Sequence, residues 1–91
     1  MIMTDNRSDT IETAILECVH AREPGATICP SEVARGLWPA NAWRSRMDEV
    51  RAAAARLADS GEIVATQHGA PVDIQTVRGP IRIGRPPDNA K

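Results

Sequence analysis

The apolar positions of the chain follow two different periods, and helical spacing comes first. Over residues 10–22 the apolar side chains recur every three or four positions, which is the spacing of an amphipathic α-helix. Asp9 is placed to cap this helix, and Glu12 completes a capping-box pattern with it. A Pro-Gly pair at 24–25 follows, and neither residue continues a helix. The pattern therefore predicts a first helix that ends near residue 22.

Two more helices are predicted before the spacing changes. Residues 27–29 form a short β-prone segment, and Pro30 follows at the first position of a second helix, where its missing N–H costs nothing. Pro39 ends that helix. A third and longest helix is predicted over residues 41–60, with Asn41 as its N-terminal cap. Its apolar residues fall on one stripe that faces the core: Trp43, Met47, Val50, Ala54, Leu57 and Ala58.

After the third helix the pattern becomes that of strands. Residues 62–67 predict a strand, residues 68–71 a turn and residues 72–77 an extended loop. Residues 78–83 predict a second strand in which Arg and Ile alternate, and Pro80 within it indicates a position at the edge of a sheet. Two strands joined by a loop therefore complete the predicted elements.

The order of these elements is typical of one fold class. Helix, short strand, helix, helix, strand, loop and strand is the order of an α+β winged helix-turn-helix domain, with three helices and a C-terminal wing of two or three strands. The interpretation assigns residues 1–8 to a disordered leader, 9–84 to the winged-helix domain and 85–91 to a disordered tail. The predicted core combines side chains from all three helices and a strand: Ile15, Val33, Met47, Val50, Leu57 and Ile63.

Several runs of residues carry a resemblance to a known family. They are Thr27-Ile28-Cys29-Pro30-Ser31-Glu32-Val33-Ala34-Arg35, Trp43-Arg44, Met47, Val50-Arg51, Thr66-Gln67, Gly69, Pro71-Val72-Asp73 and Arg78-Gly79-Pro80-Ile81-Arg82. With these runs the chain resembles, over residues 11–83, a small bacterial family known only as a domain of unknown function. The resemblance implies a winged-helix fold in a bacterial cytoplasmic protein. It implies no activity, ligand or catalytic residue.

Composition narrows the classes of function. The chain has 91 residues, no Phe or Tyr and only two Trp, which indicates a single domain with a small core. Small domains of this kind rarely gain more than about 3–5 kcal/mol from such a core, so a built-in catalytic cleft and an enzymatic activity are not expected. No segment has the pattern of a membrane span or a secretion signal. Two cysteines without export indicate a reduced, cytoplasmic protein.

Metal binding and nucleophilic catalysis are both disfavoured by residue spacing. Cys18 and His20 lie two positions apart on a helix, so their side chains point about 200° apart and cannot share a metal ion. Cys29 and His68 have no second pair of ligands near them in the sequence. We expect no metal, no cofactor and no catalytic residue.

Two residues near the second helix have alternative interpretations. Ser31 beside Glu32 could be a nucleophile, but no His lies close in sequence, and the pair is better explained as part of the helix cap. Cys29 precedes a helix start, where the pKa of a thiol is lowered. A buried, inert thiol is favoured for Cys29 because its neighbour Ile28 is a core-type residue.

A nucleic-acid binder is expected to concentrate its arginines in one region, and this chain does so only mildly. Residues 1–40 carry six acidic and three basic side chains, whereas residues 41–91 carry six acidic and eight basic ones. In a winged helix the third helix enters the major groove and the wing rests on the DNA backbone. Arginine suits both guanine edges and phosphates. The candidate DNA-binding residues are Arg44, Arg46, Arg51 and Arg56 on the third helix and Arg78 and Arg82 on the wing.

Several of these arginines also have a simpler explanation. Carboxylates at positions 48, 49 and 59 lie three or four residues away and could neutralise them within the helix. Trp38 and Trp43 could stack on bases, but core packing is the favoured interpretation. Two functions therefore stay open: a module that binds double-stranded DNA mostly through its backbone, and a protein-interaction module on the same fold. A monomer or weak dimer away from the membrane is expected in either case.

Overall fold

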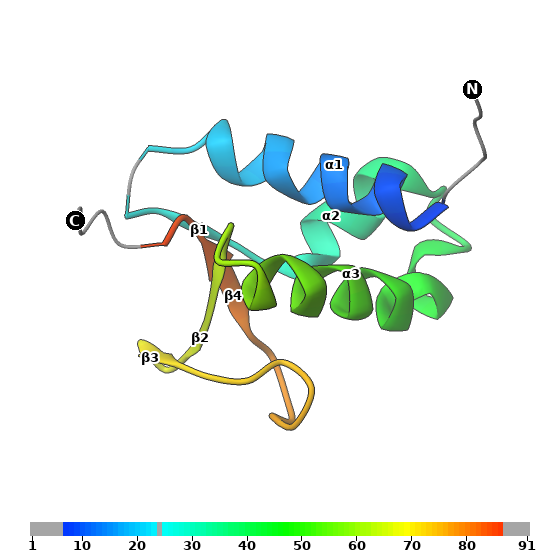
Figure 1. The fold of residues 1–91 in the computed structure, drawn as a ribbon. Helices are drawn as coiled ribbons and strands as arrows, with labels where there is room; N and C mark the ends of the chain where they lie inside the picture. Colours follow the sequence, from blue (N-terminus) through cyan, green and yellow to red (C-terminus); the bar gives the residue numbers. More distant parts are fainter. Residues whose placement is uncertain (1–6, 24, 87–91) are drawn as a thin grey trace.

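The computed structural model describes residues 7–23 and 25–86 and shows an α+β fold of three α-helices and a four-stranded antiparallel sheet (Figure 1). The elements are α1 (Arg7–His20), β1 (Thr27–Ile28), α2 (Pro30–Leu37), the 3₁₀ turn η1 (Trp43–Arg46), α3 (Met47–Asp59), β2 (Val64–Gln67), β3 (Ala70–Pro71) and β4 (Arg82–Gly84). The helices pack against one another, and the strands extend from one side of the helical layer. This arrangement is compatible with a winged helix.

Helix α1 starts earlier than the sequence indicates. It begins at Arg7, inside the segment expected to be a disordered leader, so Asp9 is the third residue of the helix and does not stand at the predicted cap position. Residues 1–6, the rest of the expected leader, lie outside the described residues. The helix ends at His20, because the next turn tightens and the N–H of Arg22 donates to the carbonyl of Val19. Gly25, with φ +92°, then reverses the chain.

The start of α2 confirms the prediction that Pro30 is its first residue. The backbone N–H of Cys29 donates to Oε2 of Glu32 at 3.2 Å, so Cys29 stands at the cap position and Glu32 closes the turn. Trp38 follows the helix in an extended conformation, with φ −130° and ψ 154°. A residue that precedes proline disfavours the helical region, and Pro39 therefore sets the end of α2.

Helix α3 begins at Met47 and not at residue 41. The carbonyl of Pro39 accepts the N–H groups of both Ala42 and Trp43, and the Oγ of Ser45 donates to the carbonyl of Ala42. These bonds build the separate turn η1 ahead of the helix. The prediction that Asn41 caps a continuous helix is therefore wrong.

The sheet has the order β1-β4-β2-β3 and is antiparallel throughout. Strand β4 lies between β1 and β2, so the edge position inferred from Pro80 is wrong; Pro80 precedes the strand and leaves its hydrogen bonding intact. His68 and Gly69 have φ values of 53° and 85°, which is the conformation of a tight hairpin turn. The turn is thus shorter than predicted, and Ala70–Pro71 pair with β2 as the short strand β3.

The segment between β3 and β4 is a folded loop, called here the 72–80 loop. The N–H groups of Thr76 and Val77 both donate to the carbonyl of Asp73, which closes a turn where an extended segment was predicted. Ile74 is 6% exposed and joins the core cluster together with alanines of α3. The loop therefore contributes one buried side chain to the core, and its half-buried Val72 and Val77 pack against that core.

The core confirms five of the six predicted residues and corrects one. The confirmed side chains are Ile15, Val33, Val50, Leu57 and Ile63, each of which is buried. Met47 is only half-buried and packs against the edge of the core, because it stands at the first position of α3. Ala53, Ala54 and Ala55 are buried as well. Their small side chains let α3 approach its neighbours closely.

The predicted C-terminal tail, residues 85–91, is also corrected at its first residue. The Nη2 of Arg85 donates to the carbonyls of His20 and Arg22, both at 2.9 Å. These carbonyls lie at the end of α1, where a helix has unpaired acceptors and a partial negative charge. Arg85 therefore ties the end of β4 to α1. Residues 87–91 lie outside the described residues.

Candidate nucleic-acid interface

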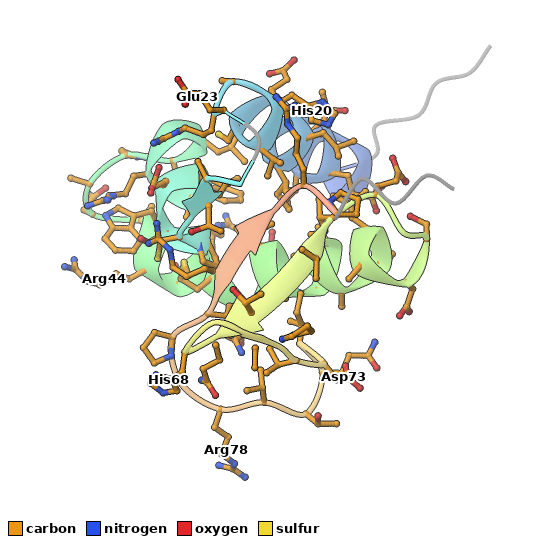
Figure 2. All side chains as sticks on the ribbon, turned by 90° about the vertical axis from the view of Figure 1, so that its left-hand side faces the viewer. His20, Glu23, Arg44, His68, Asp73 and Arg78 are labelled. Carbon is orange, nitrogen blue, oxygen red and sulfur yellow. The ribbon has the colours of Figure 1, made fainter. Side chains whose placement is uncertain are left out.

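The arginines predicted to contact DNA occupy different environments. Three of them are bound to other parts of the fold: Arg51, Arg56 and Arg82. One is stacked and paired, Arg46. Two extend away from the body of the domain, Arg44 and Arg78 (Figure 2). The structure therefore separates a set that the sequence presents as uniform.

Arg51 connects α3 to the 72–80 loop. Its Nη2 donates to the carbonyl of Val77 and its Nη1 to the carbonyl of Gly79, both at 3.3 Å. The side chain is half-buried, so it is not free to enter a DNA groove. The expected intrahelical pair with Asp48 does not form among the described residues.

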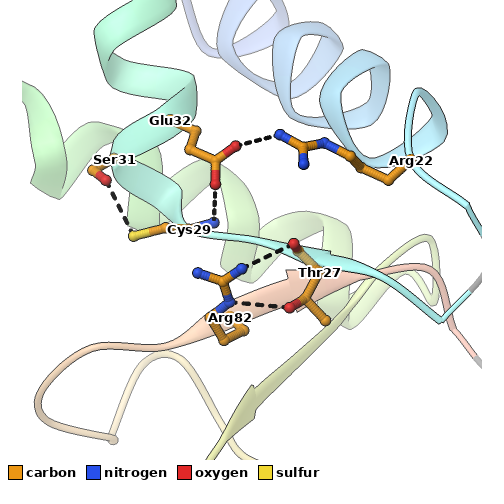
Figure 3. Close-up of polar contacts among 6 residues, drawn as sticks. All are labelled: Arg22, Thr27, Cys29, Ser31, Glu32 and Arg82. Atoms are coloured by element: carbon orange, nitrogen blue, oxygen red, sulfur yellow. Dashed lines mark hydrogen bonds and ion pairs between the residues drawn. The ribbon is translucent and has the colours of Figure 1, made fainter.

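Arg56 and Arg82 are likewise occupied. The Nε of Arg56 lies 2.6 Å from Oε2 of Glu12, which joins α3 to α1 in place of the expected pair with the carboxylate at position 59. Arg82 donates through Nε to Oγ1 of Thr27 and through Nη2 to the carbonyl of Thr27, both at 3.0 Å (Figure 3). Arg82 therefore holds β4 to β1.

The exposed face of α3 is mainly acidic. Its exposed positions, spaced as one helical stripe, are Asp48, Ala52, Arg56 and Asp59. Since Arg56 is already paired with α1, the charges of this stripe that have no salt bridge among the described residues are the carboxylates of Asp48 and Asp59. Carboxylates repel phosphate groups. The middle of α3 thus lacks the row of arginines expected for a groove-reading helix.

A basic cluster instead occupies the corner where α2 meets η1. Cζ of Arg44 lies 4.6 Å from the ring centroid of Trp43, and Cζ of Arg35 lies 5.5 Å from the same centroid. Cζ of Arg46 lies 5.6 Å from the ring centroid of Trp38. These five residues, Arg35, Trp38, Trp43, Arg44 and Arg46, are called here the arginine–tryptophan cluster.

The tryptophans of this cluster hold the guanidinium groups in place. Trp38 and Trp43 are half-buried and pack against the core, so the prediction of core packing is right for part of each side chain. A guanidinium group stacked on an aromatic ring keeps its N–H edge free for oxygen acceptors. Arg35 joins the cluster although it is not among the arginines predicted from the sequence to bind DNA. It lies on α2, eight positions before Trp43, and the turn between the helices brings the two together.

The cluster carries a net positive charge. Nη1 of Arg46 forms an ion pair with Oε2 of Glu49 at 3.0 Å, as the three-residue spacing predicts. Arg35 and Arg44 are exposed and have no carboxylate partner within the described part of the chain. Two of the three guanidinium groups are therefore available to an external acceptor.

Comparison with protein families places the chain in one of them. A family model described as "Protein of unknown function (DUF3253)" matches residues 8–86. The chain belongs to the DUF3253 family. This result confirms the resemblance to a domain of unknown function. No curated protein matches the chain.

The cysteines of this DUF3253 domain are both free and half-buried. Burial raises the pKa of the Cys18 thiol; the carboxylate of Glu32 raises it further, and Arg22 opposes the effect. The Oγ of Ser31 donates to Sγ of Cys29 at 3.1 Å (Figure 3). Across the described residues no three His, Cys, Asp or Glu side chains are grouped to hold a metal ion. No described helix is long and apolar enough to span a membrane.

Proposed function

We propose that this DUF3253 domain binds double-stranded DNA, mainly through phosphate contacts made by the arginine–tryptophan cluster. The 72–80 loop acts as the wing and contacts the neighbouring backbone. The observation that carries the proposal is the arrangement of Arg35, Arg44 and Arg46 over two half-buried tryptophans, with a single carboxylate partner among the described residues. Such a setting favours binding of an oxyanion over simple solvation of the charges.

Preorganisation of the arginine side chains favours phosphate binding by the cluster. An arginine side chain loses rotamer freedom when it binds a phosphate, and stacking on an indole ring removes part of that freedom in advance. The free edge of the guanidinium group then makes two parallel N–H···O bonds with a phosphate. Arg44 lies in η1, directly before the N-terminus of α3, which in winged-helix complexes is the end of the helix closest to DNA.

The acidic stripe of α3 limits how the domain binds. Two unpaired carboxylates, Asp48 and Asp59, oppose insertion of the middle of the helix into a groove lined by phosphates. The arginine–tryptophan cluster and the 72–80 loop are therefore expected to contact the phosphate backbone of the DNA. Such contacts discriminate little between base sequences. The proposal places the protein in the cytoplasm, where DNA is accessible and thiols such as Cys18 and Cys29 remain reduced.

A protein-interaction role is the second candidate, and the same stripe favours it. An acidic helix face suits a basic protein surface, and Trp and Arg are the residue types that most often dominate binding energy at protein interfaces. Under this alternative the arginine–tryptophan cluster contacts a protein carboxylate in place of a phosphate.

A salt titration of duplex binding distinguishes the two functions. In fluorescence anisotropy at about 50 mM salt, the unmutated domain is expected to bind a short duplex, with log K falling by about 0.9 per phosphate contact against log salt. Arg44→Ala should weaken binding and flatten that slope by about one unit. Arg22→Ala is the matched control, because Arg22 is exposed, lies outside the cluster and already pairs with Glu32. Absence of duplex binding by the unmutated domain at low salt would refute the proposal and favour the protein partner.

A further inference from the structure

The 72–80 loop has an unusual pattern of backbone contacts. Two side chains from other elements hold four consecutive carbonyls of the loop. Arg51 of α3 binds the carbonyls of Val77 and Gly79. Gln67 of β2 donates through Nε2 to the carbonyl of Arg78 at 2.7 Å and to that of Pro80 at 3.1 Å. The carbonyls of residues 77–80 therefore face the body of the domain.

This pattern determines where the amide groups of the loop point. In a trans peptide the N–H points away from the carbonyl of the preceding residue, and the described chain contains no cis peptide. Since the carbonyls of Val77 and Arg78 face inward, the N–H groups of Arg78 and Gly79 face outward. Neither N–H donates to an acceptor among the described residues.

Glycine is needed at position 79 for this geometry. Its φ is +90°, a backbone conformation that L side chains rarely adopt. Left-handed residues in turns bring successive N–H groups together into small concavities that bind anions. The side chain of Arg78 is exposed and points away from the domain (Figure 2).

We propose that Arg78 and Gly79 form a binding site for one phosphate oxyanion. The two outward N–H groups donate to phosphate oxygens, and the guanidinium group of Arg78 supplies the charge. Arg51 adds a second positive charge behind the carbonyls. In the cell the phosphate belongs to the DNA backbone, and that part of the inference rests on the proposed function. The affinity of the loop for phosphate does not depend on it.

The charges around the loop agree with an anion site. The nearest acidic residue of the loop is Asp73, whose Oδ1 accepts the N–H of Gln75 at 2.9 Å. Figure 2 shows Asp73 on the opposite side of the loop from His68, with Arg78 between them at its outer end. A phosphate held at Arg78 is therefore not placed against the carboxylate.

Backbone amide NMR with inorganic phosphate as the probe tests the site directly. The amide resonances of Arg78 and Gly79 are expected to shift saturably with phosphate and not with sodium chloride at equal ionic strength. Gln67→Ala releases two carbonyls without removing a charge and should abolish the shift. Gln75→Ala, an equally neutral change at an exposed position of the same loop, should leave it intact. Arg51→Lys keeps the charge but loses the two-pronged contact, and should weaken the shift.

Two outcomes of this titration would overturn the proposal. One is a response of Arg78 and Gly79 no larger than that of other surface amides. The other is an unchanged response in Gln67→Ala with a melting temperature equal to that of the parent, since the positioning of the loop would then be irrelevant.

A second arm with a short duplex identifies the source of the phosphate. Gln67→Ala is expected to lower the salt slope of duplex binding by about one unit, as Arg78→Ala does, and the double variant should bind no more weakly than Arg78→Ala alone. A phosphate response without any duplex binding would retain the site for free phosphate and refute the proposed function. Duplex binding that is insensitive to Gln67→Ala would refute the assignment of the site to the DNA backbone.

Discussion

Two groups of arginines in this domain have the same chemistry and different partners. On the sheet side, Arg51 and Arg82 donate to backbone carbonyls and hold the loop and the strands together. At the corner of α2 and η1, Arg35 and Arg44 lie over Trp43 without a carboxylate partner among the described residues. An arginine becomes structural when a protein acceptor lies within reach, and remains available for a ligand when only an aromatic ring does.

This difference bears on how basic residues are counted in small domains. Residues 41–91 include eight basic residues, and of the seven that the structure describes only Arg44 and Arg78 face outward without a carboxylate or carbonyl partner. The surface available to DNA is therefore less basic than the composition indicates. A positive formal charge predicts attraction to phosphate only after the internal pairs have been removed from the count.

The largest expected effect comes from Leu57, a core residue of α3. Leu57 is 3% exposed and lies on the face of α3 opposite its acidic stripe. Leu57→Ala should lower the free energy of unfolding by about 2–5 kcal/mol, because it removes buried methyl groups and leaves a cavity. Chemical denaturation measures the loss, with exposed Ala52→Ser as the control expected within about 0.5 kcal/mol. Equal stability of Leu57→Ala and the parent would show that α3 is oriented differently and that the division of the arginines is wrong.

A smaller effect is expected at Arg82, on stability and not on binding. The sequence predicts that Arg82 contacts a phosphate, whereas in the structure Arg82 donates two hydrogen bonds to Thr27. Arg82→Ala should lower the free energy of unfolding by about 1 kcal/mol, since a typical hydrogen bond contributes about 0.5–1.5 kcal/mol and this pair is exposed. The salt slope of duplex binding should stay the same. A flattened salt slope of duplex binding, with an unchanged melting temperature of Arg82→Ala, would show that Arg82 contacts DNA and does not stabilise the sheet.

Substitution of Arg35 is expected to change binding and to leave stability almost unchanged, the reverse of Arg82. Only the structure identifies Arg35 as part of the cluster. Arg35→Ala should weaken duplex binding and flatten the salt slope by about one unit, as for other phosphate-contacting arginines. Its loss of a single exposed cation–π contact should change the unfolding free energy by only about 0.5–1 kcal/mol. Anisotropy and thermal melting, measured on the same samples as Arg82→Ala, show whether the two substitutions separate binding from stability. If Arg35→Ala binds as the parent does, the cluster is smaller than proposed.

The smallest effect is expected from the acidic stripe. Asp48→Asn removes one unpaired carboxylate near the start of α3 and should strengthen duplex binding slightly at low salt. The gain should vanish as salt rises, because exposed charges separated by more than roughly 8–10 Å are screened near physiological ionic strength. Glu23→Gln, at an exposed position after the end of α1, is the comparison. Weaker binding by Asp48→Asn would indicate that this carboxylate contacts the partner, as the protein-interaction alternative predicts.

Much of the fold could be predicted because its signals are local. Helical spacing identifies the buried faces of α1 and α3, and Pro30 marks the start of α2. The Arg–Ile alternation places Ile81 and Ile83 inward and Arg82 outward, as the structure confirms. These features depend on residues a few positions apart, whose geometry is the same in any protein.

The candidate site was less predictable because its partners are distant in the chain. Arg51 reaches carbonyls 26 and 28 residues away, and Arg56 reaches a carboxylate 44 residues away. A carboxylate three or four residues from an arginine indicates an intrahelical ion pair, but the pair forms only where no better acceptor lies near the guanidinium group. Of the expected intrahelical pairs, the structure shows that of Arg46 with Glu49. Spacing alone could not show which acceptor each arginine would find.

The order of the main helices and strands, the apolar faces that form the core and the α+β fold class follow from the sequence alone, whereas η1 and β3 do not. The tertiary structure decided that β4 lies inside the sheet, that the 72–80 loop folds against α3 and that Arg35 joins Trp43. The physical reason is the range of the interactions. Periodicity and capping act within one or two turns of chain, whereas a guanidinium group binds whichever acceptor the packed helices and strands bring within about 3 Å of it.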